Sequence, residues 1–412
     1  MTAKEIKLKS YKERIIVSFT SYPARIDTVH VIVECMLKQT IMPDKIVLYL
    51  AEEQFPGREI PENLCAYIGE IFEIHWCDED LKSHKKYYYA FQEFREDIVI
   101  TIDDDLIYPE RMIEELLDYY GKYPQCILAR RAKLMLINKN KEIAKYEEWY
   151  NVLKGYVGIP RMDLFLTTGG GTLFPPHILG GEVFNKEVFM TICKHADDIW
   201  INLARIIYGI PTLLVKRFCD FGLIDAYQRN GLYENYNGAG GNDAQLKDVL
   251  EWGTQFFENR EALLDKIFSK KEFFYEEREL RYCQDMQYVL EDLCEVVEQN
   301  EEVVLYGAGM IAKRLAVYLQ EKGLLNKLSA FAVKNTEENE SDILGVTVRD
   351  IRQYVNTNTV IVLGVVRPKH DEVILELNGL GIANDRIECF DGLFWQAVGF
   401  LKKEQEKQKL KL

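Results

Sequence analysis

The sequence has too few basic residues for a nucleic-acid partner and no apolar run long enough to span a membrane. Its 51 Lys and Arg residues are outnumbered by 66 Asp and Glu residues, which gives a formal net charge of −15. This balance would repel nucleic acid unless the cations were concentrated on one face, and no such concentration precedes the C-terminus. No segment approaches the roughly 20 apolar residues of a membrane span, and the charged start of the chain is unlike a signal peptide. We therefore expect a cytoplasmic protein that binds no nucleic acid.

The cysteines also lack a metal-binding pattern. All nine occur singly, with no Cys-x-x-Cys pair and no Cys/His cluster at zinc spacing. A structural zinc site of that kind is therefore excluded. Single cysteines of this kind are typical of small core residues in a reducing compartment.

The length and composition predict a globular protein of two domains. At roughly 150 residues per domain, 412 residues suffice for two domains or three. Hydrophobic residues make up 48% and charged residues 28%, as in an ordinary globular chain. We predict an N-terminal domain over residues 1–255, a helical linker over 256–299, a smaller domain over 300–400 and a Lys-rich tail over 401–412.

Apolar strand patterns alternate with helical patterns in the N-terminal domain. Short β-branched runs predict strands at Arg14–Thr20, Lys45–Leu50, Glu73–Cys77 and Ile98–Ile102. Helical spacing over Val29–Leu37 separates the first two strands, and a polar helix is expected over Lys82–Phe94. Such alternation is typical of an α/β fold with a mostly parallel sheet and helices on both faces.

Two glycine-rich stretches and a helical segment follow. Thr167–Gly181 (TTGGGTLFPPHILGG) predicts an irregular loop close to a ligand, and Tyr236–Asp243 predicts a mobile loop that closes the domain. Between Leu280 and Val297, apolar residues recur every three or four positions and form one stripe along a helix. This stripe is expected to pack either into a domain core or against a second copy of the chain, so formation of a homo-oligomer is one of two alternatives.

A second alternating pattern begins at Val303 and predicts a smaller, doubly wound domain. The strand VVLY runs into Gly307-Ala308-Gly309, a form of the Gly-rich turn that opens dinucleotide-binding domains. The acidic residue that would bind a ribose is missing, because the next strand ends at Lys334 and Asn335. No Gly-Lys-Ser/Thr triplet follows the glycines, so a Walker loop is excluded. We therefore predict a role in packing, assembly or acceptor positioning, without redox activity.

Three adjacent aspartates, Asp103 to Asp105, follow the strand Ile98–Ile102. Open α/β folds bind ligands at the carboxyl ends of their strands, and burial of like charges there is costly without a cation. Mg²⁺ and Mn²⁺ prefer carboxylate oxygens and often bridge to substrate phosphates. We predict that Asp103 and Asp105 bind such an ion. The alternative is that Asp104 and Asp105 cap a helix that starts near Pro109.

These motifs resemble those of nucleotide-sugar-dependent glycosyltransferases of the GT-A type, bacterial and family-2-like. SYPARI after the first strand, the lysine-containing helix and ITIDDDLIYP are similar to that family's nucleotide-binding half and its Asp-x-Asp motif. Ala196–Trp200 (ADDIW) resembles the acidic motif that carries the catalytic base in inverting members. The resemblance covers about residues 12–250, and the C-terminal segment is similar to Rossmann-like modules appended to bacterial glycosyltransferases.

The resemblance implies transfer of a sugar from a nucleoside diphosphate to an acceptor hydroxyl, with inversion. Such a reaction needs a metal to stabilise the leaving diphosphate and a carboxylate to remove the acceptor proton. We predict Asp198 as this base and Asp197 as the second choice, because ADDIW follows a Gly-rich loop and opens a helix. The alternative for both is an N-cap with acidic first-turn residues at the start of a helix, and capping and catalysis do not exclude each other. His177 and His195 are both options for the family's third metal ligand, and we choose His177.

Donor-binding residues are predicted around the first strand and the Gly-rich loop. They are Thr20, Ser21, Tyr22, Arg25, Asp78, Lys85, Lys86, Asp103, Asp104, Gly170 and Gly171. The glycines would let the backbone approach the sugar closely. Other interpretations stay open: Arg25 as an exposed helix residue, Asp78 as an ordinary loop residue, and the two lysines as a charged helix face. Trp200 either packs beneath the acceptor or fills the core.

The predicted partners are a nucleotide-sugar donor and a saccharide or lipid-linked acceptor, with Mn²⁺ or Mg²⁺ as cofactor. The resemblance implies a role in bacterial surface polysaccharide or glycoconjugate synthesis. The Lys-rich tail is either a solvated helix or a weak contact with anionic lipid at the inner face of the membrane. Two other functions stay open. One is a nucleotidyltransferase, although SYPAR lacks the usual glycines, and the other is a nucleotide-binding scaffold whose site has decayed.

Overall fold

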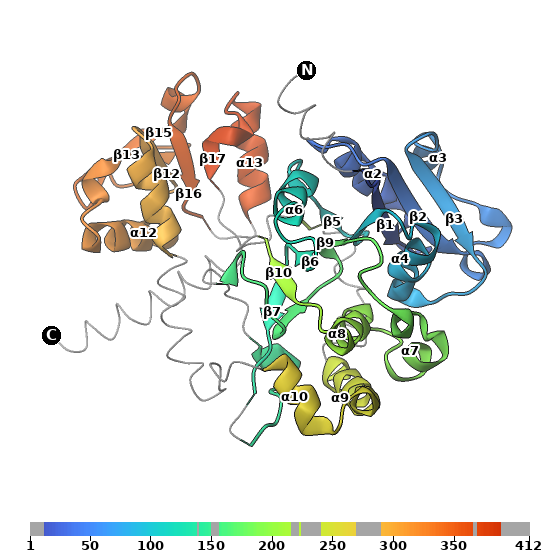
Figure 1. Cartoon of the computed structure of the whole chain (residues 1–412). Coiled ribbons are helices and arrows are strands. Elements are labelled where there is room, and N and C mark those ends of the chain that lie inside the picture. The colour runs from blue at the N-terminus through green and yellow to red at the C-terminus, as the bar shows by residue number, and fades with distance from the viewer. Residues whose placement is uncertain are drawn as a thin grey trace. The chain divides into compact units, whose positions relative to one another are not determined.

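The computed structural model describes residues 12–137, 140–149, 156–215, 222–223, 240–268, 290–365 and 369–388. The chain divides into two compact units, Met1–Arg278 and Glu279–Leu412, which are coloured along the chain in Figure 1. Each unit contains a mostly parallel sheet and helices, so the predicted α/β fold class is confirmed. The predicted domain boundaries at residues 255, 299 and 400 stay predictions.

Seven strands form the main sheet of the first unit, in the order β10-β6-β9-β4-β1-β2-β3. Six of them share one direction, and β9 runs antiparallel between β4 and β6. Two short pairs, β5 with β11 and β7 with β8, are antiparallel. The strands are β1 (Ile15–Thr20), β2 (Lys45–Ala51), β3 (Phe72–Cys77), β4 (Ile98–Ile102), β5 (Leu106–Ile107), β6 (Ile127–Ala129), β7 (Ala132–Leu134), β8 (Leu164–Leu166), β9 (Gly170–Phe174), β10 (Thr212–Leu214) and β11 (Gly222–Leu223).

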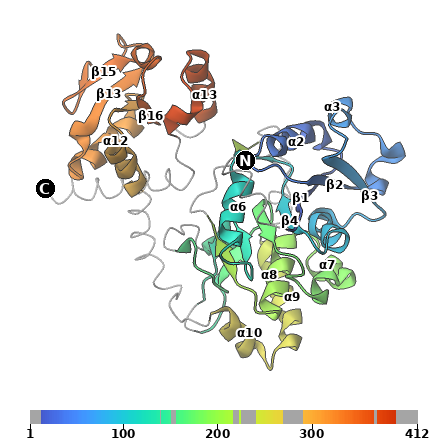
Figure 2. The same ribbon diagram turned by 45° about the horizontal axis from the view of Figure 1, so that its top comes forward.

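The helices of the first unit cover both faces of this sheet. They are α2 (Val29–Leu37), α3 (Glu62–Cys65), α4 (Lys85–Tyr88), α5 (Ala90–Glu93), α6 (Met112–Tyr120), α7 (Lys186–Ile192), α8 (Asp197–Ile207), α9 (Gly241–Gly253) and α10 (Arg260–Ile267). The helix predicted over Lys82–Phe94 is interrupted: a 3-10 turn, Lys82–His84, precedes α4, and α4 and α5 are separate. Consecutive tyrosines lose rotamer freedom in a helix, so this stretch favours a long helix only weakly. Helices α8 and α9 are in contact and lie side by side in Figures 1 and 2.

The alternation of side chains along the central strands explains why the sheet is buried on both faces. Val17 and Phe19 of β1 point into a core shared with α2 and α6. Ile16 lies on the other face, in a smaller core with Tyr49 and Ala90. Because successive side chains of a strand point to opposite faces, a continuous apolar run such as β1 needs helices on both sides. This packing fixes the ends of the strands, where the polar residues of interest lie.

The glycine-rich segment Thr167–Gly181 differs from its prediction as an irregular loop. Its middle forms β9, a fully buried strand at the centre of the sheet. Gly171 has a φ of +85°, and a Cβ there would lie 2.9 Å from the sulfur of Met112 in α6. Gly171 is therefore required by close packing against a helix, while Thr172, Leu173 and Phe174 supply ordinary strand formers.

The second unit has a sheet in the order β14-β15-β13-β12-β16-β17, parallel except for β14. Its elements are β12 (Val303–Tyr306), α12 (Met310–Glu321), β13 (Leu328–Val333), β14 (Asp342–Ile343), β15 (Val346–Asp350), β16 (Val360–Leu363), α13 (His370–Gly379) and β17 (Ile387–Glu388). At Gly307, φ is +110° and a Cβ would lie 3.1 Å from Val365. Tight packing thus accounts for this glycine, and the predicted lack of redox activity stays a prediction.

Several predicted segments lie wholly or partly outside the described residues. Of the helical stripe between Leu280 and Val297, residues 290–299 are helical, and Leu290, Leu293 and Val297 are fully buried within the chain. The loop before Gly240 and the Lys-rich tail are outside. Among the described helices, none is long and apolar enough to cross a membrane.

Candidate active site

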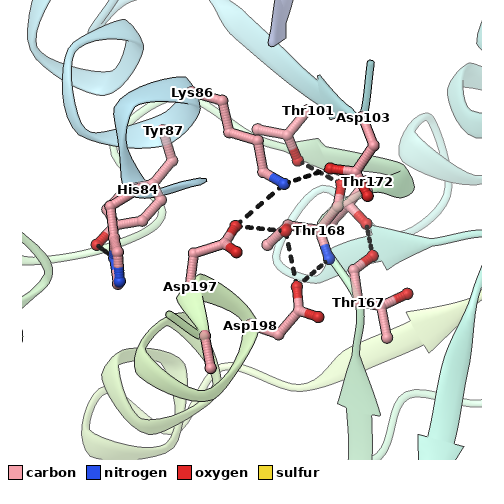
Figure 3. Close-up of polar contacts among 12 residues, drawn as sticks. His84, Lys86, Tyr87, Thr101, Asp103, Thr167, Thr168, Thr172, Asp197 and Asp198 are labelled. Atoms are coloured by element: carbon pink, nitrogen blue, oxygen red, sulfur yellow. Dashed lines mark hydrogen bonds and ion pairs between the residues drawn. The ribbon is translucent and has the colours of Figure 1, made fainter. Parts of the chain in front are cut away.

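Several chain segments meet at one edge of the main sheet, where β1, β4 and β6 end and β9 begins. Ser21 follows β1, and Asp103 to Asp105 follow β4. The segment from Thr167 to Gly169 lies at the same edge, because β9 is antiparallel to β4 and Gly170 pairs with Ile102. Figure 3 shows that Lys86 from α4 and Asp197 and Asp198 from α8 point toward this edge.

Lys86 connects the two acidic groups of the site. Its ammonium lies 2.7 Å from Asp103 Oδ1 and 3.1 Å from Asp197 Oδ2, and its side chain is only 3% exposed. Burial alone would lower the pKa of Lys86, but Asp103, Asp197 and Asp198 outweigh burial and hold that pKa above its ordinary value. Lys86 is therefore charged, and it is the cation that faces Asp103 and Asp197 together.

Thr168 holds the aspartate pair of α8. Its hydroxyl lies 2.6 Å from Asp197 Oδ2 and 2.7 Å from Asp198 Oδ1, and its backbone N–H donates to Asp198 Oδ1 at 2.6 Å. The residue at the N-cap of α8 is Ala196, and no side chain caps the helix. Neither aspartate is the N-cap, but both lie in the first turn of α8, as the alternative interpretation also predicts. Their carboxylates in addition bind a loop from another part of the chain.

The two neighbouring carboxylates have different surroundings. Burial raises the pKa of Asp197, but Lys86 and the hydrogen bond from Thr168 contribute to lowering it to about 2. Burial and the adjacent Asp197 raise the pKa of Asp198 to about 6. Like charges in a water-poor site separate in this way when a cation stabilises only one of them. The negative charge of the pair is therefore favoured on Asp197, and Asp198 is the more readily protonated of the two.

The acidic triplet is split between two cations. Asp104 is buried, and it accepts hydrogen bonds from Ser21 Oγ at 2.5 Å and from Arg25 Nη1 at 2.8 Å. The same Arg25 nitrogen lies 2.9 Å from Asp105 Oδ2. Arg25 is therefore neither an exposed helix residue nor a free cation for the donor. The capping alternative for Asp104 and Asp105 is also wrong, since a strand, β5, follows them directly.

Asp103 and Asp105 are the two carboxylates of the triplet that solvent reaches. Their side chains are 34% and 22% exposed. Burial, followed by the repulsion of Asp103, raises the pKa of Asp105 to about 6. Lys86 and Arg25 pair with four of the five carboxylates of this site, and Asp198 pairs with neither cation.

This donor set fits a hard divalent cation. Mg²⁺ and Mn²⁺ are commonly held by one or two carboxylates together with substrate phosphates. Asp103 and Asp105 would supply the carboxylates, and the raised pKa of Asp105 marks the uncompensated charge that such an ion would neutralise. No cluster of three ligating side chains occurs in the part of the chain that the structure describes.

The loop before β9 packs directly on Asp103. A Cβ on Gly169 would lie 1.5 Å from Asp103 Oδ2, so this position has room for hydrogen only. Tyr108 fixes the same loop, because its hydroxyl donates to the Gly169 carbonyl and accepts the N–H of Asp103 at 2.7 Å. The sequence analysis expected the glycines to approach a sugar, whereas this one approaches a carboxylate of the site.

A buried polar clamp fixes α8 to β8. Asn202 donates to the carbonyls of Asp198 and Leu166, at 2.8 and 2.9 Å, and accepts from the N–H of Leu166 at 3.2 Å. Arg205, fully buried, donates to Asn202 Oδ1 at 2.8 Å and to the Leu164 carbonyl at 2.5 Å. The aspartates at the start of α8 and the threonines after β8 are thus held together by side chains one and two turns further along the helix.

Several predicted site residues lie elsewhere. His177 lies beyond Phe174, the last residue of β9, which is itself roughly 13 Å along the strand from Gly170 at the usual rise per residue. It pairs with Glu96. It is therefore not a ligand of an ion held by Asp103 and Asp105. His195 precedes α8, and its backbone N–H donates to Gln245 Oε1 at 2.9 Å.

Lys85 is as buried as Lys86 but pairs with Asp80, so it does not reach a diphosphate at this edge. Gly170 and Gly171 are buried, and a Cβ on them would lie 2.7 Å from Arg131 Cβ and 2.9 Å from the Met112 sulfur. Their role in binding the donor stays a prediction. Asp104, turned into the protein, is likewise not placed to bind a donor.

The remaining predictions have mixed outcomes. Thr20 donates to the Tyr49 carbonyl, at 2.8 Å, which is a contact between strands. Trp200 is buried and donates to the Val183 carbonyl at 3.0 Å, so it fills the core. Tyr22 lies beneath the Arg25 guanidinium, 5.6 Å from it, and Asp78 is exposed after β3. The donor-binding role of these last two residues stays a prediction.

Sequence reasoning missed Thr168, Tyr108 and the Asn202–Arg205 clamp. Thr168 begins the glycine run, so a hydroxyl at the entrance of a predicted ligand loop was an available signal. The sequence contains no such signal for the clamp, because Asn202 and Arg205 have the pattern of ordinary polar residues of an amphipathic helix.

Comparisons with known proteins give no family. No family model and no curated protein matches the chain. Among solved structures, it is similar to 4-diphosphocytidyl-2C-methyl-D-erythritol synthase from Anaerococcus prevotii, with a TM-score of 0.29 and 8% identity over 43% of this chain and 77% of that one. It is also similar to a mannosyltransferase from Pyrobaculum calidifontis in complex with GDP-Man and Mn²⁺, with a TM-score of 0.38 and 11% identity over 64% and 74%. Likenesses this distant carry no argument about function, which is argued from the residues of this chain.

Proposed function

We propose that the protein is a metal-dependent glycosyltransferase that moves a sugar from a nucleoside diphosphate to an acceptor hydroxyl. The observation that carries this proposal is the pairing of two acidic groups across one buried lysine. Asp103 and Asp105 form an exposed, charge-rich group suited to a divalent cation, and Asp197 and Asp198 form a separate pair held by Thr168. Glycosyl transfer needs both functions side by side, namely a charge acceptor for the leaving diphosphate and a base for the acceptor.

Asp198 is the base in this proposal. Its Oδ1 accepts two hydrogen bonds from Thr168, whereas Oδ2 has no hydrogen-bond partner within the described residues. With a pKa raised to about 6 by burial and by Asp197, it is ionised at neutral pH yet basic enough to take a proton. Asp197 is engaged by Lys86 and by Thr168 through the same oxygen, so it positions the pair and does not face a substrate.

The chemical step balances without another reactant. Asp198 takes the proton of the acceptor hydroxyl while that oxygen forms a bond to the anomeric carbon of the sugar. The bond from this carbon to the diphosphate oxygen breaks, and the electron pair leaves with the nucleoside diphosphate. A divalent cation bound by Asp103 and Asp105 would supply neutralisation of the charge on that leaving group. Attack from the side of the base, opposite the leaving group, inverts the anomeric centre.

The acceptor, a saccharide or lipid-linked saccharide, stays a prediction, and so does the pathway. The reaction is tested by incubating the full-length protein with a panel of nucleoside-diphosphate sugars and Mn²⁺, and by measuring the released nucleoside diphosphate. We expect release from at least one donor, by transfer to added saccharides or by slow hydrolysis, and its loss in Asp198→Asn. Release of inorganic diphosphate from a nucleoside triphosphate and a sugar phosphate would instead show nucleotidyl transfer and contradict the proposal.

A further inference from the structure

Lys86 is buried more completely than a substrate-binding lysine would need to be. An ammonium removed from water costs several kcal/mol unless carboxylates compensate it. Here the compensation comes from two separate segments, since Asp103 follows β4 and Asp197 begins α8. Asp103 and Asp197 occupy opposite sides of the ammonium in Figure 3. Because only 3% of the Lys86 side chain is exposed, a donor phosphate has little access to its ammonium.

The adjacent Lys85 provides an internal comparison. It has the same burial as Lys86 and also pairs with an aspartate, Asp80. Asp80 follows β3 and additionally binds Lys82, which makes this pair a structural contact at some distance along the sheet edge. One turn of α4 thus carries two buried lysines, of which only Lys86 contacts Asp103 and Asp197.

The contacts of Lys86 also make the two aspartates of α8 unequal. Asp197 Oδ2 receives both the ammonium and the Thr168 hydroxyl. Asp198 has no direct contact with a cation in the described part of the chain, and its partners are the N–H and hydroxyl of Thr168. The groups that face Asp198 are therefore Asp197 on its own helix, Lys86 from α4 and Thr168 from the loop after β8. Without Lys86, two adjacent carboxylates would compete for one proton.

We propose that Lys86 is a positioning residue that bridges the donor side and the base side of the site, and that its contact with Asp197 leaves Asp198 free to act as the base. Lys86 does not bind the donor. The catalytic role of Lys86 rests on the proposed function. Its contacts with Asp103 and Asp197 can be tested whether or not the protein transfers a sugar. This positioning role replaces the prediction that this lysine reaches the diphosphate.

The test compares Lys86→Met and Lys86→Arg with the matched control Lys85→Met. Methionine keeps the length and removes the charge, and the control removes an equally buried charge from the neighbouring position. We expect kcat of Lys86→Met at pH 5 to fall on the order of tenfold or more, because each unit of rise in the pKa of the pair leaves about tenfold less ionised base on the acid limb. Its calorimetric affinity for a nucleoside diphosphate with Mn²⁺ should stay within about threefold of wild type, because the ion-binding carboxylates remain.

A titration of carboxyl carbons separates positioning from mere stability. The protein is labelled with carbon-13 at the aspartate carboxyls, and the spectra of Asp197→Asn and Asp198→Asn assign the two signals. We expect Lys86→Met to raise the apparent pKa of the Asp197–Asp198 pair by one or more units. The acid limb of the pH–rate profile should move by the same amount. Lys85→Met should lose stability and leave both unchanged. Lys86→Arg keeps the charge, so the carboxyl titration of this variant should stay near that of the wild type even where kcat falls. This variant replaces Lys86→Met in the test if Lys86→Met does not fold.

Three results would overturn the inference. They are a loss of nucleotide affinity in Lys86→Met that matches its loss of turnover, an unchanged carboxyl titration in that variant, and a titration in Lys86→Arg shifted as for a lost charge. A wild-type protein that transfers no sugar from any donor would sink the proposed function alone, because the carboxyl titration still decides whether Lys86 controls the aspartate pair.

Discussion

Substitution of alanine for Gly169 tests the geometry around Asp103 most sharply. The added Cβ would lie 1.5 Å from Asp103 Oδ2 and 2.0 Å from its Cγ, and real Cβ contacts below 3.0 Å essentially do not occur. The carboxylate must therefore move by about 1.5 Å, the difference between these distances, or the loop must move away from it. Either movement disturbs the 2.7 Å pair between Asp103 and Lys86.

The expected cost is larger for binding than for folding. The crowded atoms belong to a side chain that solvent partly reaches, so we expect the free energy of unfolding to fall by about 1 to 3 kcal/mol, as for other overpacked sites. Metal–ligand distances tolerate errors of only about 0.2 Å. The Mn²⁺-dependent affinity for a nucleoside diphosphate should therefore fall at least tenfold, which corresponds to about 1.4 kcal/mol.

Urea denaturation and calorimetry of Gly169→Ala measure these two quantities, and Gly181→Ala is the matched control. Gly181 ends the same glycine-rich segment, and a Cβ there would meet nothing within 4 Å. The control should keep both wild-type stability and wild-type affinity. If Gly169→Ala binds metal and nucleotide with wild-type affinity, Asp103 is not a metal ligand.

The other predictions concern the base, the clamp and the excluded histidine. Because burial and Asp197 raise the pKa of Asp198 to about 6, against about 3.9 in an unfolded chain, its ionised form destabilises the folded state, increasingly from about pH 4 and fully above pH 6. Asp198→Asn should thus abolish turnover. The same variant should raise the free energy of unfolding by about 1 kcal/mol at pH 7 and leave it unchanged at pH 3.5. A variant that is less stable than the wild type at pH 7 would contradict the assignment. Arg205→Met should lower the free energy of unfolding by about 3 kcal/mol, since it leaves buried carbonyls and Asn202 without a donor; wild-type stability in urea would refute the clamp. His177→Ala should keep the Mn²⁺ affinity within about twofold, and a larger loss would restore His177 as a ligand.

The sequence predicts structure best where all residues that define a feature lie in one short segment. The β-branched run of β4 and the aspartates that follow it predict both a strand and an acidic sheet edge, and the structure has both. The ADDIW segment likewise predicts the start of α8. Local patterns of this kind depend on residues that are neighbours in the chain, so tertiary structure only has to preserve them.

The errors concern relations between distant segments. Nothing in TTGGGTLFPPH shows that β9 runs antiparallel to β4, and that direction alone puts Gly169 beside Asp103 and His177 at the opposite edge. Lys85 and Lys86 are indistinguishable in the sequence, yet neighbouring positions of a helix point about 100° apart, so one meets Asp80 and the other Asp103. Arg25 looked available for a donor because its partners, Asp104 and Asp105, are far along the chain.

Asp103 and Asp105 are proposed to hold a divalent cation to which a nucleoside diphosphate binds. The most direct measurement is calorimetric titration of the full-length protein with nucleoside diphosphates, with and without Mn²⁺, for the wild type, Asp103→Asn and Asp105→Asn. We expect binding that requires Mn²⁺ in the wild type and falls at least tenfold in each variant, while urea denaturation shows both variants folded. Equal affinity with and without Mn²⁺, or the same Mn²⁺-dependent affinity in both folded variants, would contradict this proposal.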